Sequence, residues 1–352
     1  MLFLRYFLLL LLIVCAVTAC VGKNLQTAVI KYMSFSLIMA VVWILLKSHD
    51  LAITEAAVGA GITSVLYFLT LKKIRAIDVR KKEDPEEPHE SVPLQVAHFF
   101  THNSKMRTFY KIFAVLFCLT FAAILLYMIT YLPRFGGATN PGVNEVTERY
   151  IEQGMNEAGV VNIVTGLVLF YRAFDTFGES TVLFLAASLV LVLLRIDTKD
   201  KMHFVSADTD LAGTKNDLIL QKISLILVPS LVYFGLYIIL NGHISPGGGF
   251  SGGSVIGAGF ILFEASFGQR RVQKLLNEKS ITAIRVIALF TYGGCVSYWF
   301  LTGANGIKSA VPLGTPGDIL SSGLILIINL VVGIVVACTM YTFYVMFRRG
   351  RI

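Results

Sequence analysis

The sequence is poor in charged residues and has no paired cysteine motif. Asp, Glu, Lys and Arg make up 15% of its 352 residues, whereas hydrophobic residues make up 55%. With a mean hydropathy of +0.72, this composition excludes a soluble globular domain and a disordered chain. The five cysteines lie in apolar stretches without a C-x-x-C pair. This pattern argues against a disulfide framework or an iron–sulfur site in this chain.

Apolar stretches recur along the whole chain, each of about twenty residues, which is the length that crosses the hydrocarbon core of a bilayer. Since unpaired backbone groups cannot lie in hydrocarbon, each stretch must form a helix. The sequence therefore predicts an all-α integral membrane protein with about nine transmembrane helices. They are expected at about 2–21, 27–46, 51–71, 109–132, 176–194, 220–240, 250–267, 282–302 and 321–347.

The net charge of +8 comes from short basic clusters between the apolar stretches, a pattern that does not favour nucleic-acid binding. The clusters gather in alternate connections: 72–108, 195–219, 270–279 and the tail 348–351. The positive-inside rule then predicts an N-terminus outside and a C-terminus in the cytoplasm. A further crossing at Val160–Tyr171 would place every later loop on the opposite side and so contradict this alternation. The segment is also too short to span the hydrocarbon core. We expect that segment to be interfacial or re-entrant.

Two polar stretches divide the chain. Residues 80–93 are charged and contain proline, and residues 196–217 are polar, so both are typical of linkers. The sequence predicts three modules joined by cytoplasmic linkers. These are a three-helix module (1–79), a linker (80–108), a two-helix module (109–195), a linker (196–219) and a four-helix module (220–352).

Glu55 is a carboxylate within the third predicted span, and Asp50 lies at the start of the same span. A carboxylate inside a bilayer costs about 2.5–3.5 kcal/mol on insertion scales, so it needs a partner, water or a function. Small residues around Glu55 leave room for another helix or for water. Two interpretations remain open: a proton or cation relay, and a residue at a helix start that reaches back to the outer interface.

Asp175 and Glu179 stand four residues apart and share one helix face at the start of the fifth span. Two neighbouring anions repel one another, which suits groups that bind and release protons. The alternative is capping, with Asp175 as the N-cap and Glu179 stabilised by the helix dipole. We favour capping for Asp175 and the relay role for Glu179.

The run from Asn241 to Gly253 is rich in glycine but lacks the Gly-Lys-Ser/Thr ending of a phosphate-binding loop. Its glycines Gly249, Gly253 and Gly257 recur every four residues, which predicts close packing against a neighbouring helix.

Two titratable residues flank these glycines. Glu264 should face the same neighbouring helix, although an ordinary interfacial glutamate is an equal alternative. His243 is interpreted first as a hydrogen-bonding turn residue and second as part of an ion path.

Three runs of residues resemble known families. Asp50–Gly61 resembles the D subunit of membrane-bound, energy-converting hydrogenases, which is similar to the C-terminal part of the Mrp antiporter A subunit. Arg172–Thr181 resembles the hydrogenase E subunit, and Gly242–Gly253 resembles the Mrp B subunit. Together the patterns cover nearly the whole chain in the family's usual order.

The resemblance implies membership of a complex I-related assembly in the prokaryotic cytoplasmic (inner) membrane. Sodium and protons would be the transported ions, and Glu55, Asp175 and Glu179 stand where the family keeps acidic residues. The implied partners are small C-, E-, F- and G-type subunits, antiporter-like subunits, membrane lipids and a redox arm. No cofactor or metal site is expected in this chain, and any iron–sulfur or nickel centre would lie in partner subunits.

Three functions of different classes follow. The first is a membrane subunit of an Mrp-type sodium/proton antiporter module, alone or as the membrane arm of a hydrogenase or ferredoxin-linked oxidoreductase. The second is a structural adaptor that joins the ion-pumping unit to a redox arm without carrying ions. An independent enzyme is the weakest, because no nucleophile–base pair or metal cluster is visible, so a non-catalytic subunit is expected.

Overall fold

The computed structural model describes residues 2–22, 24–83, 104–133, 137, 140, 142–194, 218–268, 272, 277–307 and 309–349. Within these ranges every regular element is a helix. Nine of the described helical stretches are long and apolar enough to cross a membrane, which confirms the predicted all-α membrane fold. The described residues form two compact units, one of residues 1–76 with 149–352 and one of residues 77–148.

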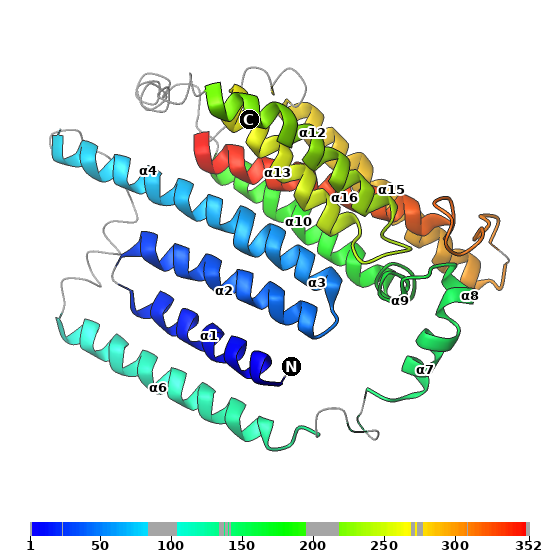
Figure 1. Ribbon diagram of the computed structural model, residues 1–352, viewed down its shortest axis with the longest axis horizontal. Coiled ribbons are helices and arrows are strands. Elements are labelled where there is room, and N and C mark those ends of the chain that lie inside the picture. Colours follow the sequence, from blue (N-terminus) through cyan, green and yellow to red (C-terminus); the bar gives the residue numbers. More distant parts are fainter. Residues whose placement is uncertain are drawn as a thin grey trace. The chain divides into compact units, whose positions relative to one another are not determined.

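The first three spans run back and forth beside one another (Figure 1). They are α1 (Leu2–Val21), α2 (Leu25–Leu45) and a third span built from α3 (His49–Thr54), the π-helical segment η1 (Glu55–Thr63) and α4 (Ser64–Glu83). Asn24 caps α2 by accepting a hydrogen bond from the Gln26 N–H at 3.0 Å. α2 packs against α1, α3 and η1.

The third span differs from the uniform helix expected at 51–71. It begins at His49 and widens into a π-helical turn from Glu55. The Glu55 carboxylate and the Ser36 hydroxyl both lie over Gly59, where a Cβ would collide with them. The wider turn therefore lies at a contact with α2, which the pattern of apolar residues does not predict.

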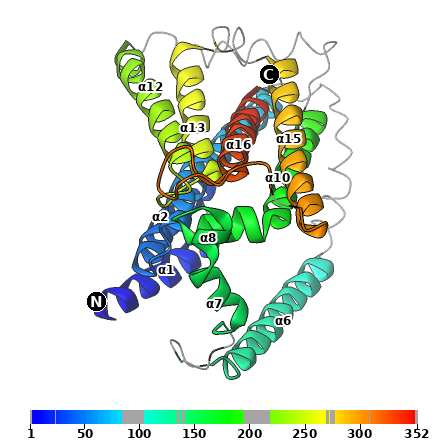
Figure 2. The same ribbon diagram turned by 90° about the vertical axis from the view of Figure 1, so that its right-hand side faces the viewer.

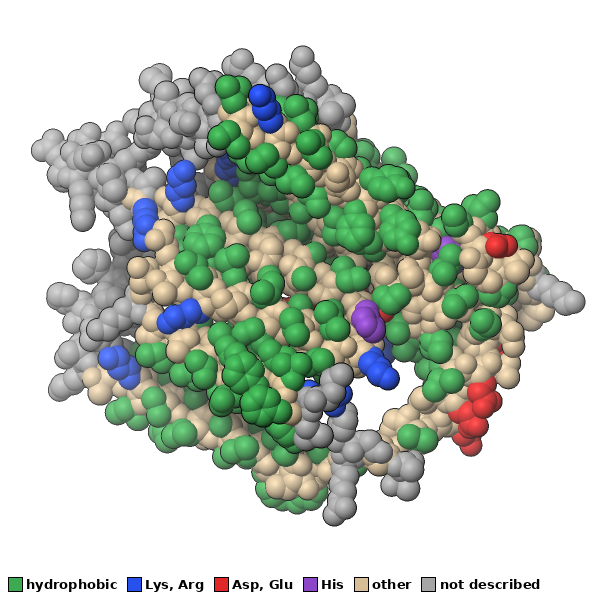
Figure 3. Space-filling view, in the orientation of Figure 1, with side chains coloured by type: hydrophobic (Ala, Val, Ile, Leu, Met, Phe, Trp, Pro, Cys, Tyr) green, Lys and Arg blue, Asp and Glu red, His purple; other side chains and the backbone are tan. Residues whose placement is uncertain are grey.

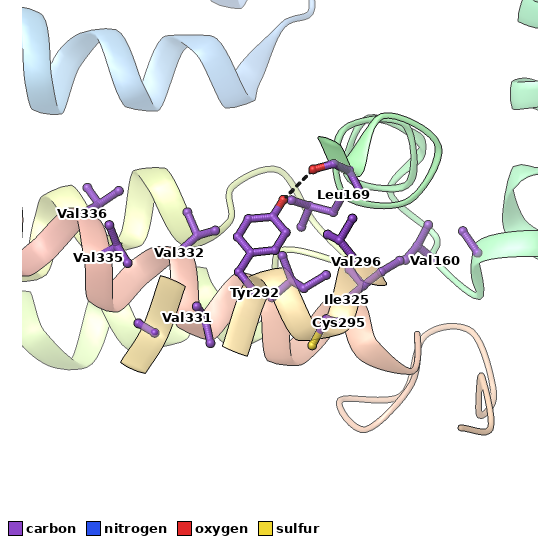
Figure 4. Close-up of a cluster of buried hydrophobic side chains, with 14 of the residues drawn as sticks. Val160, Leu169, Tyr292, Cys295, Val296, Ile325, Val331, Val332, Val335 and Val336 are labelled. Carbon is purple, nitrogen blue, oxygen red and sulfur yellow. Dashed lines mark hydrogen bonds between the residues drawn. The ribbon is translucent and has the colours of Figure 1, made fainter. Parts of the chain in front are cut away.

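The C-terminal part is a bundle around α16 (Leu324–Arg349). Its other long helices are α10 (Ala173–Leu194), α12 (Leu218–Leu240), α13 (Gly249–Phe267) and α15 (Glu278–Ala304). All four pack against α16 (Figures 1 and 2). Valines of α16 (Val331, Val332, Val335 and Val336) fill the core together with Tyr292 and Val296 of α15 (Figure 4).

The segment Val160–Tyr171 forms two short elements, α9 (Ile163–Gly166) and η2 (Leu167–Tyr171). Figure 4 shows this segment end-on, so that it runs across the direction of α13 and α16. It follows α7 (Glu145–Glu152) and α8 (Gly154–Ala158), and Asn162 caps α9 by accepting from the Val164 N–H at 3.0 Å. Val160 and Leu169 are buried in the α16 core.

In the smaller unit, α6 (Ser104–Ile129) is one long apolar helix. Its rings Phe109, Phe113, Phe117 and Phe121 stack along one face at four-residue spacing. Apolar side chains likewise cover much of the surface along the helices in Figure 3. The predicted linkers overlap the helix ends, since α4 continues to Glu83 and α6 begins at Ser104, while residues 84–103 and 195–217 lie outside the described residues.

Candidate functional site

The Glu55 carboxylate is held within the third span. Ser36 of α2, which is fully buried, donates its hydroxyl proton to Glu55 Oε1. Glu55 is the first residue of η1, and π-helical turns inside α-helices are frequent at functional sites. Glu55 is half-buried and η1 packs against α13 as well as α2. The carboxylate thus sits where the N-terminal spans meet the C-terminal bundle.

Asp50 contacts the glycine-rich loop that precedes α13. Its Oδ1 accepts a hydrogen bond from the Gly247 N–H. Gly247 has φ +126° and Gly248 has φ +157°, which are values that residues with a Cβ rarely adopt. The structure therefore brings Asp50 and the loop that carries His243 together, although they are far apart in the sequence.

The crosswise segment holds the other side of this loop. Asn162 Nδ2 donates to the carbonyl oxygens of Gly242 (3.2 Å) and Ser245 (3.1 Å), and Thr165 Oγ1 donates to Gly242 O at 2.6 Å. The backbone N–H groups of Val161 and Asn162 both donate to His243 O. These bonds satisfy carbonyl groups that would otherwise be buried without a partner.

His243 is fully buried in this loop. Its Nε2 lies 2.9 Å from the carbonyl oxygen of Asp318, so the ring proton is assigned to Nε2. Within the described residues Nδ1 has no hydrogen-bond partner. Beside it, Asn329 of α16 accepts the Gly249 N–H at 3.0 Å, a bond across the α13–α16 interface.

Glu264 lies near the other end of α13 and is fully buried among the helices. Tyr341 of α16 donates to Glu264 Oε2 at 2.7 Å, and Arg348 Nη1 lies 3.8 Å from Oε1. A buried carboxylate needs such a donor and a cation to offset its desolvation.

Gly249, Gly253 and Gly257 of α13 face this same helix, α16. An added Cβ at Gly257 would lie 3.1 Å from Met340 Cβ, and one at Gly253 would lie 2.9 Å from Gly333 Cα. A Cβ at Gly249 would collide with Asn329 O. The contact therefore needs these positions to lack side chains.

Asp175 and Glu179 lie on the exposed side of α10. α10 begins at Ala173, so the expectation that Asp175 is the N-cap is wrong: it lies in the first turn. There it accepts from Arg172 Nε at 2.6 Å, and α10 begins three residues before the predicted span 176–194.

Outside the spans, Glu157 of α8 joins two other side chains. Arg149 donates to its Oε1 at 2.8 Å and Tyr171 donates to Oε2. These hydrogen bonds, first that of Arg149, lower the pKa of Glu157. Burial and the bond to Glu157 raise the pKa of Tyr171 to about 12. The sequence interpretation did not identify this group, which ties α7 and α8 to η2.

Arg285 of α15 is the second feature that the sequence interpretation missed. Its side chain is fully buried, and the signal was a basic residue inside the predicted span 282–302. Among the described residues, no group of three His, Cys, Asp or Glu side chains is arranged to hold a metal ion.

Three family models match successive parts of the chain. Residues 10–76 match the D subunit of MBH, residues 107–202 match the E subunit of MBH, and residues 219–342 match a domain related to the MnhB subunit of Na+/H+ antiporters. The three matches follow one another without overlap, so one polypeptide contains regions that are similar to three separate subunits.

Two relatives and two solved structures are similar to the chain. An uncharacterized protein of Methanocaldococcus jannaschii is 27% identical over 63% of this chain and 86% of its own length. A probable K(+)/H(+) antiporter A/B subunit of Rhizobium meliloti is 26% identical over 46% of this chain. The Mrp complex from Dietzia sp. DQ12-45-1b aligns with a TM-score of 0.69 at 20% identity over 98% of this chain. The membrane-bound sulfane sulfur reductase, an archaeal respiratory membrane complex, aligns with a TM-score of 0.51 at 28% identity over 67% of this chain and 96% of its own chain.

The chain spans 18% of the rhizobial protein and 34% of the Dietzia chain. It thus corresponds to a part of those longer polypeptides.

Proposed function

We propose that this chain, a membrane subunit of an Mrp-type module that carries D, E and MnhB-related domains, takes part in the exchange of sodium ions for protons. Its partners are other membrane subunits of Mrp and hydrogenase type. The chain itself performs no chemical reaction and supplies carboxylates along the ion path. The similarity to a probable K(+)/H(+) antiporter A/B subunit supports this division of labour.

One observation carries the proposal: Glu55 is held inside a membrane span by a buried hydroxyl at a π-helical turn. A carboxylate placed at this cost within a bilayer is expected to serve an ion or proton pathway. A π-helical turn has i→i+5 hydrogen bonds. If these bonds shifted by one residue to the α-helical pattern, the helix would rotate locally and the carboxylate of Glu55 would point in another direction. Glu55 is therefore proposed as the principal relay residue.

The other candidates take subsidiary roles. Asp50 of α3 contacts the glycine-rich loop and His243 lies on it, at the same end of α13, and both would receive the ion or proton there. Glu264 would act at the far end of α13. Glu179 is exposed on α10, where a carboxylate of this chain can face a neighbouring subunit, while the ion pair with Arg172 favours a local structural role for Asp175.

The assembly lies in the prokaryotic cytoplasmic membrane, with the N-terminus outside, as the distribution of Lys and Arg favours. The similarity to the membrane-bound sulfane sulfur reductase, a respiratory complex, supports a role for this chain in the membrane arm of a redox complex. Any iron–sulfur or nickel centre would then belong to partner subunits.

The test uses membrane vesicles that contain the whole complex. Glu55→Gln keeps the side-chain volume but removes the charge, and sodium-dependent proton exchange should fall at least about tenfold, the effect of about 1.4 kcal/mol on the barrier. Ser36→Ala should reduce exchange less, because it removes a donor but leaves the carboxylate. Glu152→Gln on the exposed face of α7 is the matched control.

Full exchange in Glu55→Gln, with normal amounts of assembled complex, would sink the relay role. If Glu179→Gln and Glu264→Gln were equally silent, the structural adaptor would be the better description. That outcome is distinguishable from misfolding, since co-purification of the partner subunits reports assembly separately.

A further inference from the structure

Arg285 is a cation enclosed by the C-terminal bundle. Its side chain is 0% exposed, and its guanidinium carbon lies 5.7 Å from the centroid of the Phe184 ring of α10. Cys338 of α16 lies within electrostatic range of the guanidinium. The charge is therefore surrounded by α10, α15 and α16, and a cation–π contact stabilises it only in part.

No described residue accepts a hydrogen bond from this guanidinium. Nε, Nη1 and Nη2 are all buried and without a partner among the described residues. A guanidinium has five N–H donors and stays protonated in proteins. A buried charge without a partner is costly, and inside a membrane it is by default a candidate for function.

The charge lies within the membrane-spanning part of the bundle. Arg285 is residue 7 of the 25 in the span Lys279–Gly303. Phe184 is residue 12 of the 22 in the span Ala173–Leu194, and Cys338 is residue 15 of the 25 in the span Leu324–Arg348. Because Arg285 is fully buried in the protein, its surroundings have a low dielectric constant. A fixed charge there creates a strong local potential.

Buried polar groups lie on both sides of Arg285 along the bundle. The ring pairs Phe174–Phe300 and Phe177–Tyr292 and the contact of Phe184 with Arg285 show that α10 and α15 are antiparallel. Toward the start of α10 lie three buried polar side chains: Thr176, Ser180 and Tyr292. Toward the end of α16 lies Thr342, which is buried one turn beyond Cys338; the buried Tyr341–Glu264 pair belongs to the neighbouring α13–α16 interface. Arg285 thus lies between buried polar side chains on either side of it along the bundle.

We propose that Arg285 is an electrostatic barrier that prevents cations and protons from crossing the bundle between α10, α15 and α16. The inference rests on the proposed function, because only an ion-translocating assembly needs to keep such a polar interface closed. A buried arginine that repels cations is a known physical means of closing a pore to them. The barrier restricts ion movement to the path of the carboxylates, so that sodium ions cross only in exchange for protons.

The experiment measures passive leak in vesicles that contain the complete complex, with an imposed proton or sodium gradient and no counter-ion to exchange. Arg285→Met removes the charge at similar length, and the gradient should decay about tenfold faster than in the wild type, which corresponds to about 1.4 kcal/mol in the barrier. Arg285→Lys retains a charge and should leak no faster than the wild type.

A second pair of variants leaves Arg285 in place. Cys338→Asp sets an anion beside the guanidinium and neutralises the site, so it should also leak. Cys338→Ser is nearly the same size and uncharged, and it should not. If Arg285→Met does not assemble, the comparison of these two variants decides.

Tight vesicles from assembled Arg285→Met and Cys338→Asp complexes would overturn the barrier, as would equal leak from Arg285→Lys and Arg285→Met. Failure of both neutralised variants to assemble, with Arg285→Lys assembled, would make the charge a folding requirement and also overturn it. The leak is measured without a counter-ion and so does not depend on exchange. The result therefore remains valid even if the relay role proposed for Glu55 is wrong.

Discussion

The first span, α1, and the last, α16, are almost equally hydrophobic but have opposite surroundings. In α1 6% of the span window is buried by the rest of the chain, and in α16 the share is 72%. α1 carries long side chains such as Leu10 toward the outside, whereas α16 presents Gly333, valines and Asn329 to its neighbours. Because lipid tails are as apolar as leucine, hydropathy drives insertion but not helix association. Small residues and polar bonds decide which span becomes the core.

The largest effect is expected where α13 and α16 touch. Gly253→Ala would place a Cβ 2.9 Å from Gly333 Cα, so the helices must separate, at a cost of about 1–3 kcal/mol or more. Thermal unfolding of the detergent-purified chain should show a clear loss of stability.

The matched control is Gly178→Ala on α10, where an added Cβ meets nothing within 4 Å. Alanine favours helix over glycine by up to about 1 kcal/mol, so this variant should be as stable as the wild type or more so. Equal thermal stability of the two variants would contradict this comparison, because it would mean that close packing does not hold α16 in place.

An intermediate effect is expected for Ile328→Ala on α16, whose side chain is 0% exposed, compared with Leu10→Ala on α1, whose side chain is 61% exposed. Truncation of a buried isoleucine to alanine in a water-soluble core lowers the free energy of unfolding by about 2–5 kcal/mol. We expect the lower end of that range for Ile328, because part of the cost is transfer from water, which is absent between lipid and protein interior.

Leu10→Ala should leave the melting temperature of the isolated chain nearly unchanged. If it destabilises the chain as much as Ile328→Ala does, α1 is packed as tightly as α16 and the contrast fails.

The smallest effect is expected outside the packed spans, at Glu157. Its pKa is lowered by Arg149 and Tyr171, so its contribution to stability is present above its unfolded pKa and is lost as the pH falls through its folded pKa. Acidification below pH about 4, the ordinary range of a carboxyl group, should loosen the α7–α8 connection, and limited proteolysis should detect this.

Glu157→Gln is the control for this prediction. The variant should be cleaved at one rate at neutral and acidic pH, and a pH-dependent difference that persists in it would assign the effect to another group.

Hydropathy predicted the nine spans well, because the bilayer imposes one length and one composition on every crossing helix. The four-residue spacing of the α13 glycines likewise pointed to a close neighbour, and in the structure that neighbour is α16. The local sequence pattern did not predict the π-helical turn at Glu55 or the hydrogen bond that Glu55 accepts there from Ser36 of another helix. Nor could it supply the bond from Gly247 to Asp50, which joins residues 197 positions apart.

Arg285 was overlooked for a different reason. The positive-inside rule uses the lysines and arginines of loops to assign orientation, so it says nothing about an arginine within a span. The position of Arg285 within an apolar stretch was visible in the sequence, but its complete burial and the lack of an acceptor among the described residues required the coordinates.

The bonds from the crosswise segment to the glycine-rich loop have a consequence for biogenesis. Asn162 and Thr165 bond to loop residues 77 to 83 positions later, and Asn329 completes the same cluster from a helix made later still. These segments are synthesised one after another. The loop therefore stays at the hydrated headgroup region of the membrane until α16 has been inserted. Maturation of this protein should therefore end with a docking step that follows the insertion of its last helix.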